Sequence, residues 1–436
     1  MTYEEPNPIL VQARRAIAGK SGPERVQVVL RAVEANRRWR GQECLNLLAP
    51  EALVSPTVRN LLSSELCQRA AEGEIGNRWF SGLRHIDEIE ALCVELLKEL
   101  FDSNYADHRL VSGMNGNMTV YTALTQPGDI VMSLPQPAGG HSSNRPDGPA
   151  GIRGLKVVDI PFDYDEMEVD LDRCLDVMRH VRPRILTLGA SLTLFPFPLR
   201  QLREACDEMS CYLYFDGAHQ LGLMVGGQFQ DPLREGVHVM TGSSGKTLSG
   251  PQGGVIVWND HELTRPLRST IFPVIAATHM VNRVAALAVA AAEMIAFGQE
   301  YMAQIVKNAQ ALGVALEAQG FKVIGAHKGY TRTQQILVDV REFGGGYLNA
   351  ERLATANVTV NKNLLPTDTP EYWDRPSGLR LGTTEVTRLG MKENEMSTIA
   401  GFIARVVVHK EDVERIAGEV KEFRAGYQRV QYCFDT

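Results

Sequence analysis

The sequence YLYFDGAHQLGLMV at residues 212–225, followed after a gap by HVMTGSSGKTLSGPQGG at residues 238–254, decides the fold. It contains two short apolar segments, Tyr212–Phe215 and Val237–Met240, which have the composition of buried strands. Each segment leads into small and polar residues: Asp216, Ala218 and His219 after the first, and Thr241, Ser243, Ser244 and Lys246 after the second. Because neighbouring parallel strands end at the same edge of a sheet, we expect these two clusters to form one site.

A lysine and an acid indicate the chemistry of this site. Lys246 stands in a run of Gly, Ser and Thr, where a long cationic side chain has no packing role. A lysine amine can form a Schiff base with the aldehyde of pyridoxal 5'-phosphate. An acid such as Asp216 can keep the pyridine nitrogen of this cofactor protonated, so that the ring accepts electrons. The pair therefore predicts a pyridoxal phosphate site.

The segments before this stretch predict an α/β fold. Apolar, strand-like segments alternate with amphipathic, helix-like segments. The expected strands are 129–134, 155–160 and 185–190, and the expected helices are 171–180 and 198–209. Such alternation is typical of a mainly parallel sheet covered by helices. Ser191 directly follows a strand, so it also falls at the edge where the site is expected.

The blocks DGAHQLGLMVGGQFQDPL and TGSSGKTLSGPQGG resemble the signature of serine hydroxymethyltransferases, especially of their archaeal-type branch. The resemblance extends in separated blocks from about Leu45 to about Met396. It implies a fold-type I, aspartate aminotransferase-like transferase that binds pyridoxal phosphate. In that fold a mainly parallel central sheet is joined to a small α+β C-terminal domain. The resemblance also implies a homodimer, or a tetramer, with active sites at the subunit interface.

The resemblance and the helical patterns divide the chain into three expected parts. These are an N-terminal arm that packs on a partner subunit (1–50), a large cofactor-binding domain (51–298) and a small C-terminal domain (299–436). The boundary is placed near Gly298, between two expected helices at 276–297 and 301–319.

Ser112, Gly113 and Met114 are expected to bind the cofactor phosphate. They precede the helical segment MTVYTAL, and a small-residue loop before a helix directs free backbone N–H groups at an anion. The block resembles the family's SGSQAN loop, with Met114 in place of a serine. The resemblance assigns further cofactor contacts to Ser191, Asp216, His219, Ser243, Lys246, Gly253 and Gly254.

Gly139, Gly140 and His141 match the family's GGH motif. In the family this histidine stacks on the cofactor ring. Two glycines before it permit a close approach of the backbone. We therefore expect His141 to take part in catalysis, together with Lys246 and with the other residues to which the resemblance gives a catalytic role, Asp216, His219 and Glu72.

The resemblance also identifies residues that would contact the substrates. Glu72, in AAEGEIGNRWFSG, corresponds to the family's catalytic carboxylate. Arg380, in SGLRLGTTEVTRLG, corresponds to the arginine that binds the amino-acid carboxylate, a role suited to a planar guanidinium. Asn363, in VNKNLLP, corresponds to an asparagine that binds the pterin of tetrahydrofolate. Phe80 lies in the same block as Glu72, and Glu51 lies in LNLLAPEALVS, which resembles the family's block that approaches the substrate.

At four further positions, besides Met114, the chain departs from the family pattern. Pro50 replaces a serine, Ala70 and Phe80 replace tyrosines, and Gly245 replaces the histidine before the lysine. We expect Gly245 to remove a proton-transfer partner and to open space beside Lys246. Gln252 stands where many members have arginine, although the archaeal-type branch shares the glutamine.

Composition excludes several other classes of protein. The chain has 436 residues and a formal net charge of −7, which argues against a nucleic-acid or anionic-membrane partner. Neither a signal peptide nor an apolar run long enough to cross a bilayer is evident. Seven cysteines without paired spacing favour the cytoplasm, and the absence of CxxC and HExxH argues against a metal site. GKT at 245–247 is no P-loop, because Met240 stands where the motif needs glycine.

One more helix is expected at Ile86–Leu100. Its glutamates, Glu88, Glu90 and Glu95, are placed on the outer face.

The first prediction for function is hydroxymethyl transfer between serine, or an α-substituted serine, and glycine or its α-alkyl homologue, with a tetrahydrofolate-type carrier. Asn363 favours this reading. The alternative is a folate-independent threonine aldolase or transaldolase-like enzyme, which the altered residues favour. A third hypothesis is a non-catalytic protein with this fold, and the presence of Lys246, Asp216, His141 and Arg380 argues against it.

Overall fold

A seven-stranded sheet forms the centre of the larger domain in the computed structural model, which describes residues 7–369, 372 and 374–434. The strand order is β4-β12-β11-β10-β9-β5-β6. The bounds are β4 (Tyr105–Asp107), β5 (Ile130–Ser133), β6 (Lys156–Asp159), β9 (Ile185–Leu188), β10 (Tyr212–Asp216), β11 (Val239–Ser243) and β12 (Gly254–Trp258). Only β12 runs antiparallel to its neighbours, so the expectation of a mainly parallel sheet is confirmed.

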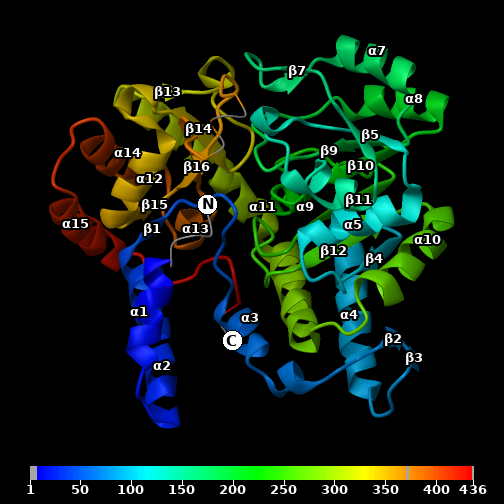
Figure 1. Cartoon of the computed structure of the whole chain (residues 1–436), viewed down its shortest axis with the longest axis horizontal. Helices are drawn as coiled ribbons and strands as arrows, with labels where there is room; N and C mark the ends of the chain where they lie inside the picture. Colours follow the sequence, from blue (N-terminus) through cyan, green and yellow to red (C-terminus); the bar gives the residue numbers. More distant parts are fainter. Residues whose placement is uncertain (1–6, 370–371, 373, 435–436) are drawn as a thin grey trace.

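Helices cover both faces of this sheet (Figure 1). The residues of β10 show why: Leu213 and Phe215 join one core cluster, whereas Tyr214 between them joins the core on the opposite face. The first face is covered by α4 (Arg84–Phe101), α7 (Leu171–Val181), α8 (Leu199–Met209), α9 (Leu221–Val225) and the first half of α11 (Val281–Ala318). The second face is covered by α5 (Gly113–Leu124), α6 (Pro149–Ile152) and α10 (Thr264–Ser269).

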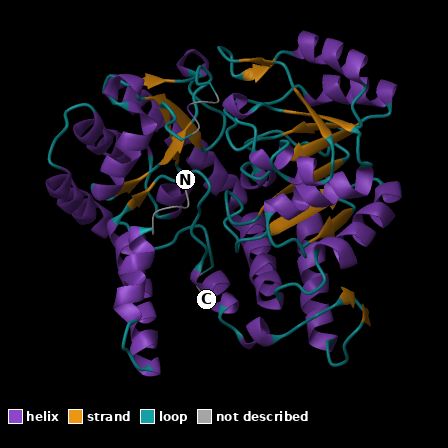
Figure 2. Cartoon of the chain, in the orientation of Figure 1, coloured by secondary structure: helices purple, strands orange, loops and turns teal. Residues whose placement is uncertain are grey.

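The smaller domain is an antiparallel sheet packed against helices, as expected (Figure 2). The order of its four strands is β13-β14-β17-β16. Their bounds are β13 (Lys322–Val323), β14 (Gln335–Asp339), β16 (Asn361–Asn363) and β17 (Gly378–Gly382). The helices are α12 (Gly345–Thr355), α13 (Thr384–Arg388), α14 (Glu393–Val407) and α15 (Val413–Ala425). Two-residue strands, β1 (Leu45–Asn46) and β15 (Val358–Thr359), pair beside this sheet, so the segment after the arm belongs to this domain.

One continuous helix, α11, joins the two domains, and the predicted break at Gly298 is wrong. Its side chains change from the larger core to the smaller one between Ile305 and Ala309. Among the described residues, α11 is also the one helix that is long and apolar enough to cross a membrane. However, 61% of its most apolar window is buried inside the protein, as in the core helix of a folded domain.

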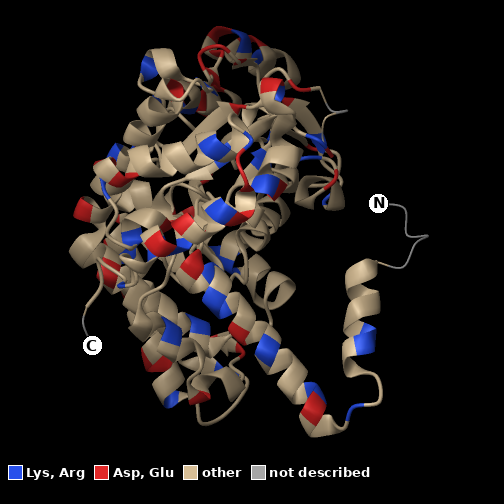
Figure 3. Ribbon diagram, turned by 90° about the vertical axis from the view of Figure 1, so that its left-hand side faces the viewer, with Lys and Arg blue, Asp and Glu red and all other residues tan. Residues whose placement is uncertain are grey.

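The N-terminal arm projects from the body of the molecule (Figure 3). It consists of α1 (Pro8–Ile17) and α2 (Gly22–Arg38), and neither helix has a buried residue. Several of their exposed side chains are large and apolar, namely Ile9, Leu10, Ile17, Val26, Val29, Leu30 and Val33. The arm is followed by β1 and then by α3 (Pro56–Leu62), which packs on α11.

Two short hairpins lie at the periphery of the larger domain. A hairpin of β2 (Gly73–Glu74) and β3 (Asn77–Arg78) carries the segment around Glu72. A second hairpin pairs β7 (Phe162–Asp163) with β8 (Glu168–Val169).

Candidate active site

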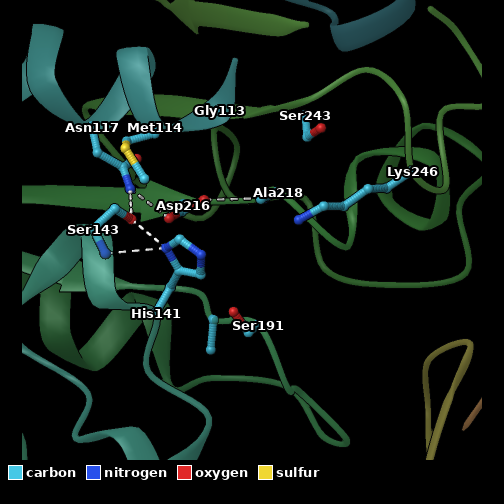
Figure 4. Close-up of a pocket in the computed structure, with 11 residues that line it drawn as sticks. Gly113, Met114, Asn117, His141, Ser143, Ser191, Asp216, Ala218, Ser243 and Lys246 are labelled. Atoms are coloured by element: carbon cyan, nitrogen blue, oxygen red, sulfur yellow. Dashed lines mark hydrogen bonds between the residues drawn. The ribbon is translucent and has the colours of Figure 1, made fainter. Parts of the chain in front are cut away.

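One pocket lies at the carboxyl ends of β9, β10 and β11, where the sequence predicts it (Figure 4). Asp216 ends β10 and Ser243 ends β11, while Ser191 and Lys246 lie in the segments that follow β9 and β11. The residues that line the pocket are Gly113, Met114, Asn117, His141, Ser143, Ala190, Ser191, Asp216, Ala218, Ser243 and Lys246.

Asp216 is held rigidly at the floor of this pocket. Its Oδ2 accepts hydrogen bonds from Nδ2 of Asn117 (2.9 Å) and Nδ2 of Asn144 (3.1 Å). Its Oδ1 accepts one from the backbone N–H of Ala218 (3.2 Å). With the carboxylate fixed on both oxygens and 4% exposed, its position is set before any ligand binds.

His141 is oriented by the same network. The close approach of the backbone that the two glycines permit is confirmed. Gly139 has φ +91°, and a Cβ on Gly140 would lie 2.0 Å from the Leu134 carbonyl oxygen. The Ser143 N–H donates to Nδ1 of His141 (3.1 Å), so Nδ1 is an acceptor and the neutral ring carries its proton on Nε2. Burial, together with the cations of Lys246 and Arg380, lowers the pKa of His141, although Asp216 opposes this shift.

Lys246 points its amine into the pocket from the other side (Figure 4). Burial lowers the pKa of this amine to about 8, and the Arg380 charge adds to the effect while Asp216 opposes it. No hydrogen bond joins the amine to another residue within the described part of the chain. A lysine that loses its proton near neutral pH is a ready nucleophile for an aldehyde.

The amino end of α5 forms the anion-binding side of the pocket. The Ser112 side chain caps this helix by accepting from the Asn115 N–H (3.3 Å), and Gly113 and Met114 form its first turn. Backbone N–H groups there and the Ser243 hydroxyl face the same space. The cradle, the acid and the nucleophilic amine together match the phosphate, ring nitrogen and aldehyde of pyridoxal phosphate.

Arg380 reaches the site from β17 of the smaller domain. Its Nη1 donates to the Ser191 carbonyl oxygen (2.6 Å), and its Nη2 lies 3.3 Å from Oδ1 of Asn361. Its Nε is buried without a partner among the described residues. Burial lowers the pKa of Arg380 to about 10, which leaves it cationic at neutral pH. A buried guanidinium with a spare donor fits a carboxylate that the chain itself does not supply.

Comparison with known proteins decides the family. A family model described as serine hydroxymethyltransferase matches residues 24–403. The chain is 46% identical over 410 residues to the serine hydroxymethyltransferase of Methanocella arvoryzae, which covers 94% of this chain and 96% of that protein. It is 45% identical over 413 residues to the one of Thermococcus kodakarensis, which covers 93% and 95%.

The chain belongs to the serine hydroxymethyltransferase family. Enzymes of this family use pyridoxal phosphate as cofactor and tetrahydrofolate as co-substrate, and they are oligomeric. The archaeal sources of these relatives agree with the archaeal-type resemblance in the sequence.

Three residues predicted to contact substrate lie outside the pocket of the single chain. Glu72 accepts a hydrogen bond from Oγ1 of Thr278 (2.6 Å). Phe80, in the same segment, is exposed. Glu51 pairs with Nη2 of Arg40 (2.6 Å).

The other predicted residues lie close to the pocket without lining it. Asn363 is in β16, on the same strand face as Asn361, the neighbour of Arg380. Gly253 and Gly254 lie beside the Ser243–Lys246 turn, where the Gly253 carbonyl oxygen accepts from the Ser244 N–H (3.0 Å). His219 is buried behind the wall of the pocket and contacts the smaller domain.

The expectation of open space at Gly245 is wrong. A Cβ there would lie 2.7 Å from Cδ of Gln252 and 2.8 Å from both of its terminal atoms. The Gln252 side chain therefore occupies the volume beside Gly245. A family histidine at this position would need Gln252 to move.

The expectation that Glu90 faces solvent is also wrong. Glu90 lies in the buried stripe of α4 and is 1% exposed. Its Oε1 is 2.7 Å from Nε2 of His279, and its Oε2 is 2.8 Å from Nη2 of Arg78 and 3.3 Å from Nε2 of His108. Burial alone would raise the pKa of Glu90, but the hydrogen bonds with His108 and His279 outweigh it, so the pKa is lowered. Glu90, His108 and His279 are residues of the types that bind metal ions. However, the Arg78 guanidinium already forms an ion pair with the Glu90 carboxylate.

Sequence reasoning gave no role to several residues that shape the site. Asn117 lies in α5, just after the Ser112–Met114 loop, and Ser143 and Asn144 follow His141 closely. All three hold Asp216 or His141. Asn117 is a polar residue one turn into an otherwise apolar helix, and this pattern could have indicated a role in the site. Gln335 had no such signal, because its partners lie in the other domain.

Proposed function

We propose that this chain is a pyridoxal phosphate-dependent hydroxymethyltransferase that makes or breaks the Cα–Cβ bond of a β-hydroxy amino acid. The one-carbon unit passes to or from tetrahydrofolate. Family membership supports this activity, and one observation of the structure carries it. Lys246 and Asp216 line one pocket, and Arg380 of the smaller domain binds Ser191 in the wall of that pocket with its Nε left without a partner among the described residues. Activity that needs no folate, as in an aldolase, is the alternative outcome of the tests below.

Each residue of the pocket has a distinct task in this reaction. When bound, pyridoxal phosphate supplies an electron sink for the pair released as the Cα–Cβ bond breaks. Asp216 holds a proton at the pyridine nitrogen, and His141 supports the ring from a fixed tautomer. The first turn of α5 and Ser243 bind the phosphate, and Arg380 binds the amino-acid carboxylate through the donors that Ser191 and Asn361 leave free.

The working unit is proposed to be a homodimer in the cytoplasm. The exposed apolar residues of α1 and α2 support an arm that packs on a partner, and Trp79, beside Phe80, is 76% exposed. In such a dimer Glu72, Phe80 and Glu51 would enter the partner's site, where Glu72 would handle the proton of the substrate hydroxyl. Among the described residues, six cysteines have free thiols, namely Cys44, Cys67, Cys93, Cys174, Cys206 and Cys211, which agrees with a reducing compartment.

The substrate is proposed to be α-substituted. Three departures from the family, Pro50, Ala70 and Phe80, each remove a hydroxyl from the substrate side of the site. A pocket wall with fewer hydroxyl groups suits an apolar α-substituent and weakens the hold on unmodified serine. Gly245 does not provide room for such a substituent, because the Gln252 side chain fills the space beside it.

An absorbance titration of the cofactor-loaded protein tests this proposal. Serine, α-methylserine, glycine, D-alanine and threonine are added with and without tetrahydrofolate. A cofactor absorbance change that needs folate and is larger with α-methylserine or D-alanine supports the proposal. A change with threonine alone, with release of acetaldehyde, supports the aldolase alternative.

A further inference from the structure

Gln335 joins the two domains directly behind the pocket. It begins β14 of the smaller domain, and its side chain is fully buried. Its Oε1 accepts from the Thr193 N–H (2.8 Å), and its Nε2 donates to the Ser191 carbonyl oxygen (2.7 Å). The same Nε2 lies 3.2 Å from Nδ1 of His219. One amide therefore contacts two large-domain segments that border the cofactor pocket.

The two backbone partners fix the orientation of this amide. A backbone N–H can only donate, so the atom facing Thr193 must be the oxygen of Gln335. A carbonyl oxygen can only accept, so the atom facing Ser191 must be the nitrogen. A flipped amide would place a donor against a donor and an acceptor against an acceptor in a buried place.

The fixed amide in turn determines the protonation of His219. Because the group facing Nδ1 is a donor, Nδ1 must accept and cannot carry a proton. The neutral ring then carries its proton on Nε2. The surroundings of the ring favour its neutral form. Burial is the largest cause that places the pKa of His219 well below its usual range, and Lys246, Arg380 and His141 add to this shift. A hydrogen bond with the Ala49 backbone opposes this shift and is outweighed.

We propose that Gln335 is a positioning residue of the active site, which holds His219 as the neutral Nε2–H tautomer and fixes the Ser191–Thr193 wall of the pocket. The inference about the ring stands on the hydrogen bonds alone, and its effect on catalysis rests on the proposed function. The Ser191 carbonyl oxygen accepts hydrogen bonds from both Gln335 and Arg380. By holding Ser191, Gln335 therefore also sets the position of the Arg380 guanidinium that binds substrate. A neutral His219 adds no third positive charge beside Lys246 and Arg380.

The chain offers a matched control in the preceding residue. Gln334 is also fully buried, and its Nε2 also donates to His219, but to the backbone carbonyl oxygen (3.1 Å) and not to the ring. A change at Gln334 therefore removes a contact with the same residue without touching the imidazole.

Nitrogen-15 NMR of histidine-labelled protein tests the tautomer without reference to activity. The spectrum is recorded between pH 6 and 9 for the wild type and for Gln335→Glu, Gln335→Leu and Gln334→Leu, and His219→Asn identifies the His219 signals. We expect the wild-type Nδ1 to remain unprotonated throughout, and Gln334→Leu to leave it so. In Gln335→Glu a carboxylate faces Nδ1, so we expect a proton on Nδ1, and in Gln335→Leu a mixture of tautomers.

Kinetics of the loaded enzyme then test the catalytic role. Gln335→Glu should lower kcat/KM by about tenfold or more, with a shifted pH profile, because a buried hydrogen-bonded network is disrupted. Gln334→Leu should leave the pH profile in place. A wild-type spectrum with a protonated Nδ1, or an unchanged His219 in Gln335→Glu, would overturn the proposal even if hydroxymethyl transfer is found. If no such transfer occurs, the spectra still decide the tautomer.

Discussion

Nη1 of Arg380 lies 2.6 Å from the carbonyl oxygen of Ser191, and this contact ties the smaller domain to the wall of the cofactor pocket. The guanidinium is thereby anchored on one side, while its Nε has no partner among the described residues. A substrate carboxylate would meet a donor that is already in place, so binding requires little rearrangement.

Arg380→Lys tests this anchoring. Lysine keeps the charge but has no planar fork, so it cannot hold Ser191 and a carboxylate together. We expect kcat/KM for the amino acid to fall by about 10- to 100-fold, mainly through KM, which corresponds to the loss of one charged hydrogen bond. Steady-state kinetics measure this, and the absorbance of the bound cofactor serves as the control. An unchanged KM would contradict the assigned role.

The pKa of Lys246 predicts how the cofactor-free protein captures pyridoxal phosphate. Only the neutral amine attacks an aldehyde, and burial lowers the pKa of this amine from 10.5 to about 8. The capture rate should therefore rise with pH and level off above about 8. Stopped-flow absorbance at a series of pH values measures it. A rate that continues to rise toward pH 10 would show an unperturbed lysine.

The lowered pKa of Lys246 also predicts that the stability of the folded protein depends on pH. Between about 8 and 10.5 the unfolded chain holds a proton on Lys246 that the folded chain lacks, so the free energy of unfolding increases with pH in this window. As pH falls through the window the contribution is lost. Urea unfolding of the cofactor-free protein at both ends of the window measures the change, and Lys246→Met should remove this part of it.

The contact between Gly245 and Gln252 predicts non-additive mutations. Gly245→Ala places a methyl group 2.7 Å from Cδ of Gln252, so the end of this exposed side chain must move, and the protein loses about 0.5 kcal/mol of stability or less. In a Gln252→Ala background the methyl group has room, and the cost should vanish. A double-mutant cycle of urea unfolding measures the coupling. Additive effects would mean that Gln252 does not fill this space in solution.

Subunit hybrids test whether Glu72 serves the partner's site. Lys246→Ala and Glu72→Gln are each expected to inactivate the enzyme. If the two residues act across the interface, randomly mixed dimers should regain about one quarter of wild-type activity, since half of the dimers are hybrids with one intact site each. Mixing after mild dissociation, with the unmixed variants as controls, measures this. No recovery would place Glu72 and Lys246 in the same subunit's site.

Local sequence patterns were sufficient to predict where the central strands of the larger domain end and which residues follow them. Alternating apolar segments located β9, β10 and β11, and the polar residues after them, such as Asp216 and Lys246, fell into one pocket as expected. The predicted break at Gly298 is wrong, because a glycine within a helix also permits close packing. Here its neighbour is Gly226, whose Cβ would lie 2.7 Å from the Gly298 carbonyl oxygen.

What the sequence could not supply were contacts between distant segments. Glu90 is buried because Arg78, His108 and His279 gather around it from three other segments, and no local pattern predicts that meeting. Gln335 and Gln252 acquire their roles in the same way, from Ser191 in the other domain and from Gly245 across a turn. The proposed role of Glu72 in a partner's site rests in the same way on contacts that a single chain does not contain.

Product analysis with purified, cofactor-loaded protein tests the central claim most directly. The protein is incubated with tetrahydrofolate and either serine or α-methylserine, and the amino-acid and folate products are quantified by mass spectrometry, with Lys246→Ala as the blank. Hydroxymethyl transfer predicts methylene-tetrahydrofolate in equal amount to glycine or alanine, with α-methylserine used in preference to serine. Cleavage that proceeds equally without folate, or no product from either amino acid, would contradict the account.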